Sequence, residues 1–157
     1  MQTAEELTGL FRTQGLRVTP QRQAIFRLLH GTDRHPTVDS LHDAARVDMP
    51  TISLKTVYQT VHDLEALGQV SLLDLGTGSV RVDPNVETDH HHLVCSSCGL
   101  VRDVPRADVS ALPARYGKDF RANTVEVIFR GVCDQCSARA RTPDQEPVPD
   151  QQKERHA

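Results

Sequence analysis

Two Cys-x-x-Cys pairs, Cys95–Cys98 and Cys133–Cys136, hold all four cysteines of the chain. Each pair places two thiolates on one tight turn, and four thiolates around one tetrahedral cation form a structural zinc site. The pairs are separated by residues 99–132, more than a compact zinc ribbon spans, so a shared metal ion would join the two ends of a small domain. Two separate redox pairs are the alternative, but neither lies in the βαβ pattern of a thioredoxin. The spacing favours zinc.

Capping residues and apolar spacing predict four helices in the first part of the chain. Thr3, with Glu6 three residues later, forms a capping box. Thr19 is followed by proline at the first helical position, and Thr37 and Ser53 can cap two further helices. Apolar residues recur at helical spacing after each cap. In the last helix this spacing predicts a buried face made of Leu54, Val57, Val61 and Leu64.

A β-hairpin is predicted directly after the helices. Residues 70–75 and 80–83 flank the turn sequence Gly76-Thr77-Gly78-Ser79, which is typical of a hairpin connection. Short helices followed by a hairpin are the pattern of the winged helix-turn-helix. We therefore expect a winged-helix domain that ends at the Pro84-Asn85 break.

A second, small unit follows that break. Strands are predicted at 93–95, 101–104 and 125–129, and a helix at 107–116. Units of this size usually need a metal or a partner chain for stability. The chain is thus expected to be α+β, with an N-terminal winged helix-turn-helix domain at 1–84, a small α/β domain at 85–136 and a disordered tail, poor in apolar residues, at 137–157.

Charge and hydropathy narrow the class of protein. The formal net charge is −3, so a strongly basic protein such as a histone is excluded, whereas a local basic patch is not. Residues 1–10 lack the cationic and apolar regions of a secretion signal, and no apolar run reaches the length of about 18 residues that a membrane span needs. We expect a soluble, cytoplasmic protein with no membrane partner.

A run of histidines lies just before the first cysteine pair. In a strand, His90 and His92 point to the same face, where two imidazoles can bind a metal together with carboxylates. Asp103 and Asp83 are the candidate carboxylates, and His35 is a candidate third imidazole. Taken alone, His35 is more typical of a solvated loop histidine. The histidine run itself fits a solvated segment as well as it fits a metal pair.

The common enzyme motifs are missing from the sequence. It has no His-Glu-x-x-His, no histidine followed two positions later by glutamate, no P-loop and no Gly-x-Ser-x-Gly. We therefore do not expect an enzyme. A zinc hydrolase remains only as an alternative from another functional class.

Five motifs, in this order, resemble the ferric-uptake-regulator family over about residues 4–136. They are Arg17-Val-Thr-Pro-Gln-Arg22, His35-Pro36-Thr37, Ser53-Leu-Lys-Thr-Val-Tyr58, Asp89-His-His-His-Leu-Val-Cys-Ser-Ser-Cys-Gly99 and Gly131-Val-Cys-Asp-Gln-Cys136. The resemblance implies a homodimeric, metal-responsive transcription factor, usually a repressor, with a winged-helix DNA-binding domain and an α/β dimerisation domain. Its partner would be double-stranded DNA with a palindromic operator.

The resemblance also implies roles for single residues. The structural zinc ligands would be Cys95, Cys98, Cys133 and Cys136. The regulatory metal ligands, which would join the two domains, are His35, Asp83, His90, His92 and Asp103. Aspartate at position 103 resembles the peroxide-sensing repressors, because iron-sensing relatives usually carry glutamate there. Relatives with a third metal site have a histidine where this chain has Val125, so that site is expected to be absent or incomplete.

The outward face of the fourth predicted helix offers contacts to DNA. Lys55 would contact phosphate, and Tyr58 and Gln59 could reach base edges, although Tyr58 could instead pack at the margin of the core. Arg17 and Arg22 fit phosphate or minor-groove contacts, although an exposed arginine is more often only a solvated charge.

The expected regulatory ligands also indicate how such a protein would work. Three imidazoles and two carboxylates suit Fe(II) or Mn(II). Ligands from two domains bind one ion well only when the domains close, and in a dimer this closure sets the spacing of two recognition helices. We expect a repressor controlled by Fe(II) or Mn(II), with peroxide as the preferred signal. The resemblance to peroxide-sensing repressors implies that His35 and His90 are the residues that peroxide oxidises. A plain iron or manganese uptake regulator is the alternative within the class.

Overall fold

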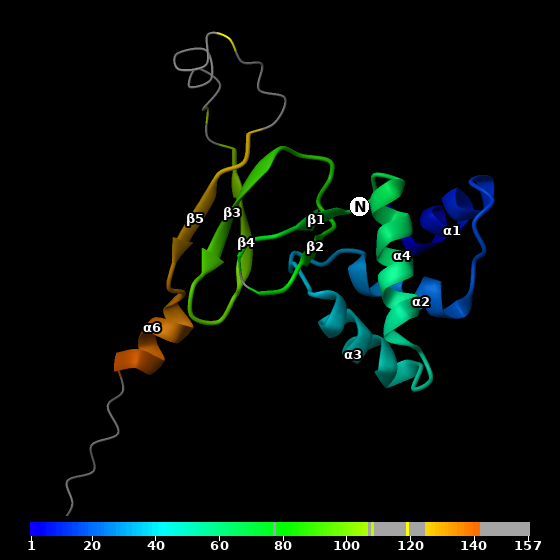
Figure 1. Cartoon of the computed structure of the whole chain (residues 1–157), viewed down its shortest axis with the longest axis horizontal. Helices are drawn as coiled ribbons and strands as arrows, with labels where there is room; N and C mark the ends of the chain where they lie inside the picture. The colour runs from blue at the N-terminus through cyan, green and yellow to red at the C-terminus, as the bar shows by residue number, and fades with distance from the viewer. Residues whose placement is uncertain (77, 107, 109–118, 120–124, 142–157) are drawn as a thin grey trace, which may run out of the picture.

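The computed structural model describes residues 1–76, 78–106, 108, 119 and 125–141. Figure 1 shows helices α1–α4 gathered at one end, a three-stranded sheet with α6 at the other, and a short hairpin between them. The bounds are α1 Ala4–Thr13, α2 Pro20–Leu29, α3 Val38–Asp48, α4 Leu54–Ala66, β1 Ser71–Leu73, β2 Arg81–Asp83, β3 His90–Cys95, β4 Val101–Pro105, β5 Ile128–Gly131 and α6 Asp134–Arg141.

The first four helices begin after the residues that cap them, as predicted. Thr3 and Glu6 form the capping box of α1, in which each side chain accepts a backbone N–H of the other residue. Thr19, Thr37 and Ser53 each accept a hydrogen bond from the backbone amide three residues later. These bonds satisfy amide groups that have no partner within the helix, and this fixes where each helix starts.

The four helices enclose one apolar core. Phe11 of α1 and Phe26 of α2 are fully buried and lie edge to face, with ring centroids 4.8 Å apart. Leu7, Ile25 and Leu29 are also fully buried beside them. The core holds the helices as one unit, so their solvent-facing sides have fixed directions.

The predicted buried face of α4 needs one correction. Val57, Val61 and Leu64 are buried, but Leu54 is 37% exposed. Leu54 is the first residue of the helix, and Thr60 completes the buried face instead, with its hydroxyl donating to the carbonyl of Thr56 at 2.7 Å. A threonine can take a buried place because this local bond satisfies its hydroxyl.

The hairpin brings a loop of the helical part to the edge of β2. β1 and β2 are antiparallel, with Ser71 opposite Asp83. Thr37 forms a β-bridge with Arg81, and the Val82 amide donates to the carbonyl of Pro36 at 2.8 Å. The residue before this segment, His35, therefore lies beside the end of β2.

The larger sheet has the order β4-β3-β5, with β3 antiparallel to β4 and parallel to β5. β3 begins at His90, earlier than predicted, because His90 already pairs with Pro105. β5 begins at Ile128, later than the predicted 125, because its pairing with β3 starts opposite His92. Leu75, Val94 and Val101 form a second, small apolar core at this sheet.

The C-terminal part was predicted to contain a helix at 107–116 and a disordered tail at 137–157. The helix predicted at 107–116 lies outside the described residues. Residues 137–141 belong to α6, so the helix continues past the predicted start of the tail, while 142–157 are not among the described residues. Within the described part of the chain, no helix has the length and apolar character needed to cross a membrane.

Candidate metal centres

The four cysteine side chains converge on one point. Their sulfur atoms all lie within 4.8 Å of one another, and those of Cys98 and Cys133 are 3.8 Å apart. A disulfide would need about 2.05 Å, and the four thiols are free. A tetrahedral zinc ion with bonds of about 2.3 Å holds its sulfur ligands about 3.8 Å apart, so this cluster fits zinc.

Strand pairing brings the two cysteine pairs together. Cys95 ends β3 opposite Gly131 of β5, and the Ser96 amide donates to the carbonyl of Gly131 at 2.7 Å. The first pair turns back at Gly99, whose amide donates to the carbonyl of Cys95 at 2.9 Å and whose φ is 71°. The second pair enters α6 directly after β5.

The pKa values of the Cys95 and Cys98 thiols differ strongly. The backbone amides of Cys133 and Cys98 donate to the Cys95 sulfur and lower its pKa to about 6. The amide of Leu100 alone would lower the pKa of Cys98, but the neighbouring sulfur atoms, with Cys136 first, raise it to about 11. Four sulfurs this close cannot all carry a negative charge unless a cation lies among them.

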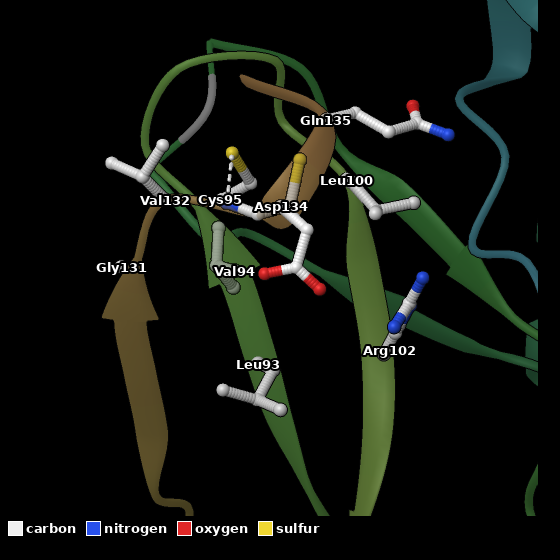
Figure 2. Close-up of a pocket in the computed structure, with 10 residues that line it drawn as sticks. Leu93, Val94, Cys95, Leu100, Arg102, Gly131, Val132, Asp134 and Gln135 are labelled. Carbon is white, nitrogen blue, oxygen red and sulfur yellow. Dashed lines mark hydrogen bonds between the residues drawn. The ribbon is translucent and has the colours of Figure 1, made fainter. Parts of the chain in front are cut away.

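A cavity of about 240 Å³ opens beside this cluster, between β3, β4 and the start of α6 (Figure 2). Its lining combines apolar side chains, such as Leu93 and Leu100, with the charged groups of Arg102 and Asp134. Cys95 and Cys133 also line it. A small molecule in this cavity would therefore lie beside these two cysteines.

A second cluster contains the predicted histidines and aspartates. Ligand atoms of His35, His90, His92 and Asp103 all lie within 4.8 Å of one another, and Asp83 lies beside them. His35 precedes α3, Asp83 ends β2, His90 and His92 lie on β3, and Asp103 lies on β4. The His35 Nε2 lies 2.9 Å from Asp103 Oδ1 and 3.4 Å from Asp83 Oδ1. The His90 Nε2 lies 3.0 Å from Asp83 Oδ2 and 3.1 Å from the His92 Nε2.

Burial makes this second cluster a strong candidate for a cation. His35, Asp83 and His92 are each less than 5% exposed. Within the described residues, both ring nitrogens of His35 and Nδ1 of His92 are buried without a hydrogen bond of good geometry. Buried polar atoms are normally hydrogen-bonded. Of these nitrogens, Nε2 of His35 faces the two carboxylates of the cluster, and a metal ion there would satisfy it. The three imidazoles and two carboxylates suit Fe(II) or Mn(II).

Two of the histidines have shifted pKa values. Burial lowers the pKa of His35, and the nearby carboxylates of Asp83 and Asp103 offset this only in part. Burial would also lower the pKa of His90, but its hydrogen bond to the carbonyl of Thr88 and the same two carboxylates outweigh it and raise the pKa. Because a carbonyl can only accept, Nδ1 of His90 carries the proton, and Nε2 is turned toward the cluster.

The side chains of the histidine run alternate between the two faces of β3, as predicted. His91 points to the opposite face of the sheet, where it is buried with its ring 6.5 Å from that of Phe129. Asp89 lies outside the cluster and pairs with Arg106. The period of the strand thus separates the two clustered imidazoles from their neighbours.

The outward face of α4 presents three of the predicted DNA contacts. Lys55, Tyr58 and Gln59 are exposed, and Arg17 is exposed on the segment before α2. The Tyr58 ring stacks on His62, with centroids 6.5 Å apart, and remains 41% exposed, so it is not packed into the core. The Gln59 amide donates to Asp63 at 2.8 Å.

Arg22 is the exception among the predicted DNA contacts. Its side chain is only 14% exposed, forms an ion pair with Asp63 of α4 and lies over the Phe11 ring at 5.3 Å. These contacts join α1, α2 and α4. The position of Arg22 therefore gives no support to its prediction as a DNA contact.

Two residues that lie near the second cluster were not predicted from the sequence. Arg81 donates to the backbone carbonyl of His35 at 3.1 Å. Asn85 donates through its side-chain amide to Asp103 at 2.8 Å and through its backbone amide to Asp83 at 2.8 Å. Neither residue is a typical metal ligand, and only their proximity in the fold reveals them.

Comparisons with known proteins identify the family and the fold. The model of the ferric uptake regulator family matches residues 13–138. The peroxide-responsive repressor PerR of Staphylococcus aureus is 34% identical over 134 residues, which cover 84% of this chain and 90% of that protein. The structure is similar to a zinc-bound manganese uptake regulator, with a TM-score of 0.68, 30% identity and coverage of 84% and 99% of the two chains. It also shares the fold of the Helicobacter pylori ferric uptake regulator, with a TM-score of 0.71, 18% identity and coverage of 85% and 90%.

Proposed function

Because the chain belongs to the ferric uptake regulator family, we propose that it is a homodimeric, metal-dependent transcriptional repressor that binds double-stranded DNA and releases it in response to peroxide. The resemblance of its motifs to this family is confirmed by the family match. We place its action in the cytoplasm, where a bacterial-type repressor meets its operator.

The observation that carries this proposal is the cluster of histidines and aspartates between the helical part and the sheet. His35 comes from the segment before α3 and Asp83 from β2, whereas His90, His92 and Asp103 come from the sheet. One ion bound by all five ligands would hold the two parts at a single angle. Their donor atoms suit Fe(II) or Mn(II), which we propose as the regulatory ions.

We propose that the four cysteines hold a structural zinc ion. The spacing of their sulfur atoms fits a closed tetrahedral site, which leaves no position for a substrate. Zinc there would fasten the end of β3 to the start of α6. The members of the family are transcriptional regulators, and we propose no enzymatic activity for this chain.

The switch would act through the distance between two copies of α4. When the ligands from both parts close on an ion, α4 of each protomer takes a fixed direction relative to the sheet. In a dimer this sets whether two recognition helices match the half-sites of a palindromic operator. A difference in affinity of about 1–3 kcal/mol between the closed and open forms is enough for such coupling. Lys55, Tyr58, Gln59 and Arg17 are the proposed DNA contacts.

Peroxide sensing is supported by two features of the chain. It is 34% identical to a peroxide-responsive repressor, and its carboxylate at position 103 is an aspartate. Bound Fe(II) supplies the redox chemistry that activates peroxide. In the net reaction, one peroxide molecule would transfer one oxygen atom to an imidazole of His35 or His90, take up the two electrons that the ring loses, and leave as water. An oxidised imidazole is a weaker ligand, so the two parts would separate and DNA would be released.

A plain iron or manganese uptake regulator is the second candidate function. The 30% identity to a manganese uptake regulator favours it, because the two chains align over most of their length. The ligands that we propose for sensing would then bind and release the ion without being oxidised.

The proposal is tested by selecting DNA from a random pool with the Mn(II)-loaded protein. We expect palindromic sequences, bound tightly with Mn(II) or Fe(II) and weakly after chelation of these ions. Brief treatment with peroxide should release the Fe(II) complex and spare the Mn(II) complex. Binding that ignores both chelator and peroxide would exclude the metal switch. Sensitivity to the chelator alone would favour the plain uptake regulator.

A further inference from the structure

We infer that Asn85 is a positioning residue that holds Asp103 with one oxygen toward the histidine–aspartate cluster and the other away from it. The inference rests on the proposed regulatory metal site and assigns to that site a residue that does not itself bind the ion. It follows from hydrogen bonds that Asn85 makes to both carboxylates of the cluster.

The two oxygens of Asp103 have different partners. Oδ1 lies 2.9 Å from Nε2 of His35 and 3.7 Å from Nε2 of His90. Oδ2 accepts a hydrogen bond of 2.8 Å from the side-chain amide of Asn85. Because the amide occupies Oδ2, Asp103 presents a single oxygen to the cluster.

Asn85 also fixes the carboxylate on the other side of the site. Its backbone N–H donates to Oδ1 of Asp83 at 2.8 Å. The Oδ2 of Asp83 is the oxygen nearest to His90, at 3.0 Å. Asp83 belongs to the hairpin and Asp103 to the sheet, so one residue connects a ligand from each of the two parts that the ion would join.

Thr88 fixes the direction of the Asn85 side chain. Its hydroxyl donates to Oδ1 of Asn85 at 3.1 Å, which leaves the NH₂ group of the amide to face Asp103. The backbone carbonyl of Thr88 accepts a hydrogen bond from Nδ1 of His90 at 2.8 Å. The short segment 85–88 therefore orients three of the proposed ligands.

The chemical consequence concerns how many oxygens reach the metal. The amide turns Oδ2 toward Asn85, so Asp103 would bind an ion through Oδ1, the oxygen that faces the cluster. Without that amide, Asp103 is free to bind through both oxygens or to turn toward solvent, since its side chain is 31% exposed. Loss of groups that orient metal ligands typically weakens metal binding about 10–100-fold.

The test compares Asn85→Ala with the wild type in the full-length, zinc-loaded protein. Mn(II) is the probe, and the electron paramagnetic resonance signal of free Mn(II) reports its affinity. We expect the Kd for Mn(II) to rise about 10–100-fold and the spectrum of the bound ion to change, because its ligand geometry changes. Thr88→Val, which removes only the hydroxyl, should shift the affinity in the same direction by a smaller factor.

Controls separate this role from a general loss of structure. Val86→Ala lies in the same segment and is exposed, so it should leave the Mn(II) affinity unchanged. Zinc content and melting temperature before Mn(II) addition should be equal in all variants. In an Asp103→Ala background, Asn85→Ala should have little further effect on affinity, since its target carboxylate is gone.

Three results would overturn the inference. An unchanged Mn(II) affinity and spectrum in Asn85→Ala would show that the amide does not position a ligand. An equal loss of affinity in the Asp103→Ala background would show that Asn85 acts on something other than Asp103. If the wild type kept its zinc but bound no Mn(II), the proposed regulatory site would fail, and the role of Asn85 with it.

Discussion

Replacing Cys98 by serine should remove the zinc ion and destabilise the three-stranded sheet. Cys98 is exposed, so the change from sulfur to oxygen creates no cavity, and any loss of stability reports on the metal. Apparent binding free energies of structural zinc are about 10–16 kcal/mol, and these are also folding free energies. Loss of the ion removes this whole contribution, which is as large as the total stability of about 5–15 kcal/mol of a typical domain, so the sheet should lose its cooperative melting transition.

The sheet has little else to compensate for this loss. Within the described residues its core contains only Leu75, Val94 and Val101 as buried apolar side chains. At about 1.5–3 kcal/mol each, they contribute less than the zinc site. Zinc per chain, measured by atomic absorption, and the calorimetric melting temperature are the two readouts. Ser97→Ala, in the same turn, is the matched control. A Cys98→Ser protein with one zinc per chain and the wild-type melting temperature would refute the four-thiolate site.

Three further predictions concern the proposed switch and DNA contact. His35→Ala and Asp83→Ala should keep zinc and the dimer but lose Mn(II)-stimulated DNA binding, measured by gel shift and light scattering, because each removes a ligand needed only for closure; loss of the dimer would contradict this. Mass spectrometry after mild peroxide should find one added oxygen on a peptide with His35 or His90 in the Fe(II) protein and none in the Mn(II) protein, whereas oxidation limited to the cysteines would indicate a thiol switch. Lys55→Ala should reduce the slope of log affinity against log salt by about 1 per protomer, because it removes one ammonium group from the DNA phosphates, and an unchanged slope would exclude Lys55 as a phosphate ligand.

Local chemistry made the helical part predictable. Thr3 and Ser53 cap helices by accepting hydrogen bonds from backbone amides three residues later, so a few consecutive residues are enough to predict their role. The exposure of Leu54 was not predictable in the same way. Spacing assigns a residue to a face of a helix, but whether another element covers the first turn depends on packing.

The cysteines and histidines were predictable because spacing and residue type together restrict what they can bind. The start of β5 at Ile128 depended instead on a pairing with β3 that is distant in sequence. Asn85 was missed because an asparagine that orients a carboxylate carries no pattern of its own. Its partner, Asp103, lies on another strand and becomes its neighbour only in the folded chain.

The parallel pairing of β3 with β5 has a consequence for the order in which the protein folds during synthesis. The four helices and most of their core are present once residue 70 has left the ribosome, and Val82 of β2 completes that core. β3 can pair with β4 soon after residue 105, but it must wait until residues 128–136 emerge before β5 and the remaining two thiols are present. Contacts between distant segments form slowly. During that interval Cys95 and Cys98 lack the other two thiols, so the four-cysteine site can close on a zinc ion only after Cys136 has emerged.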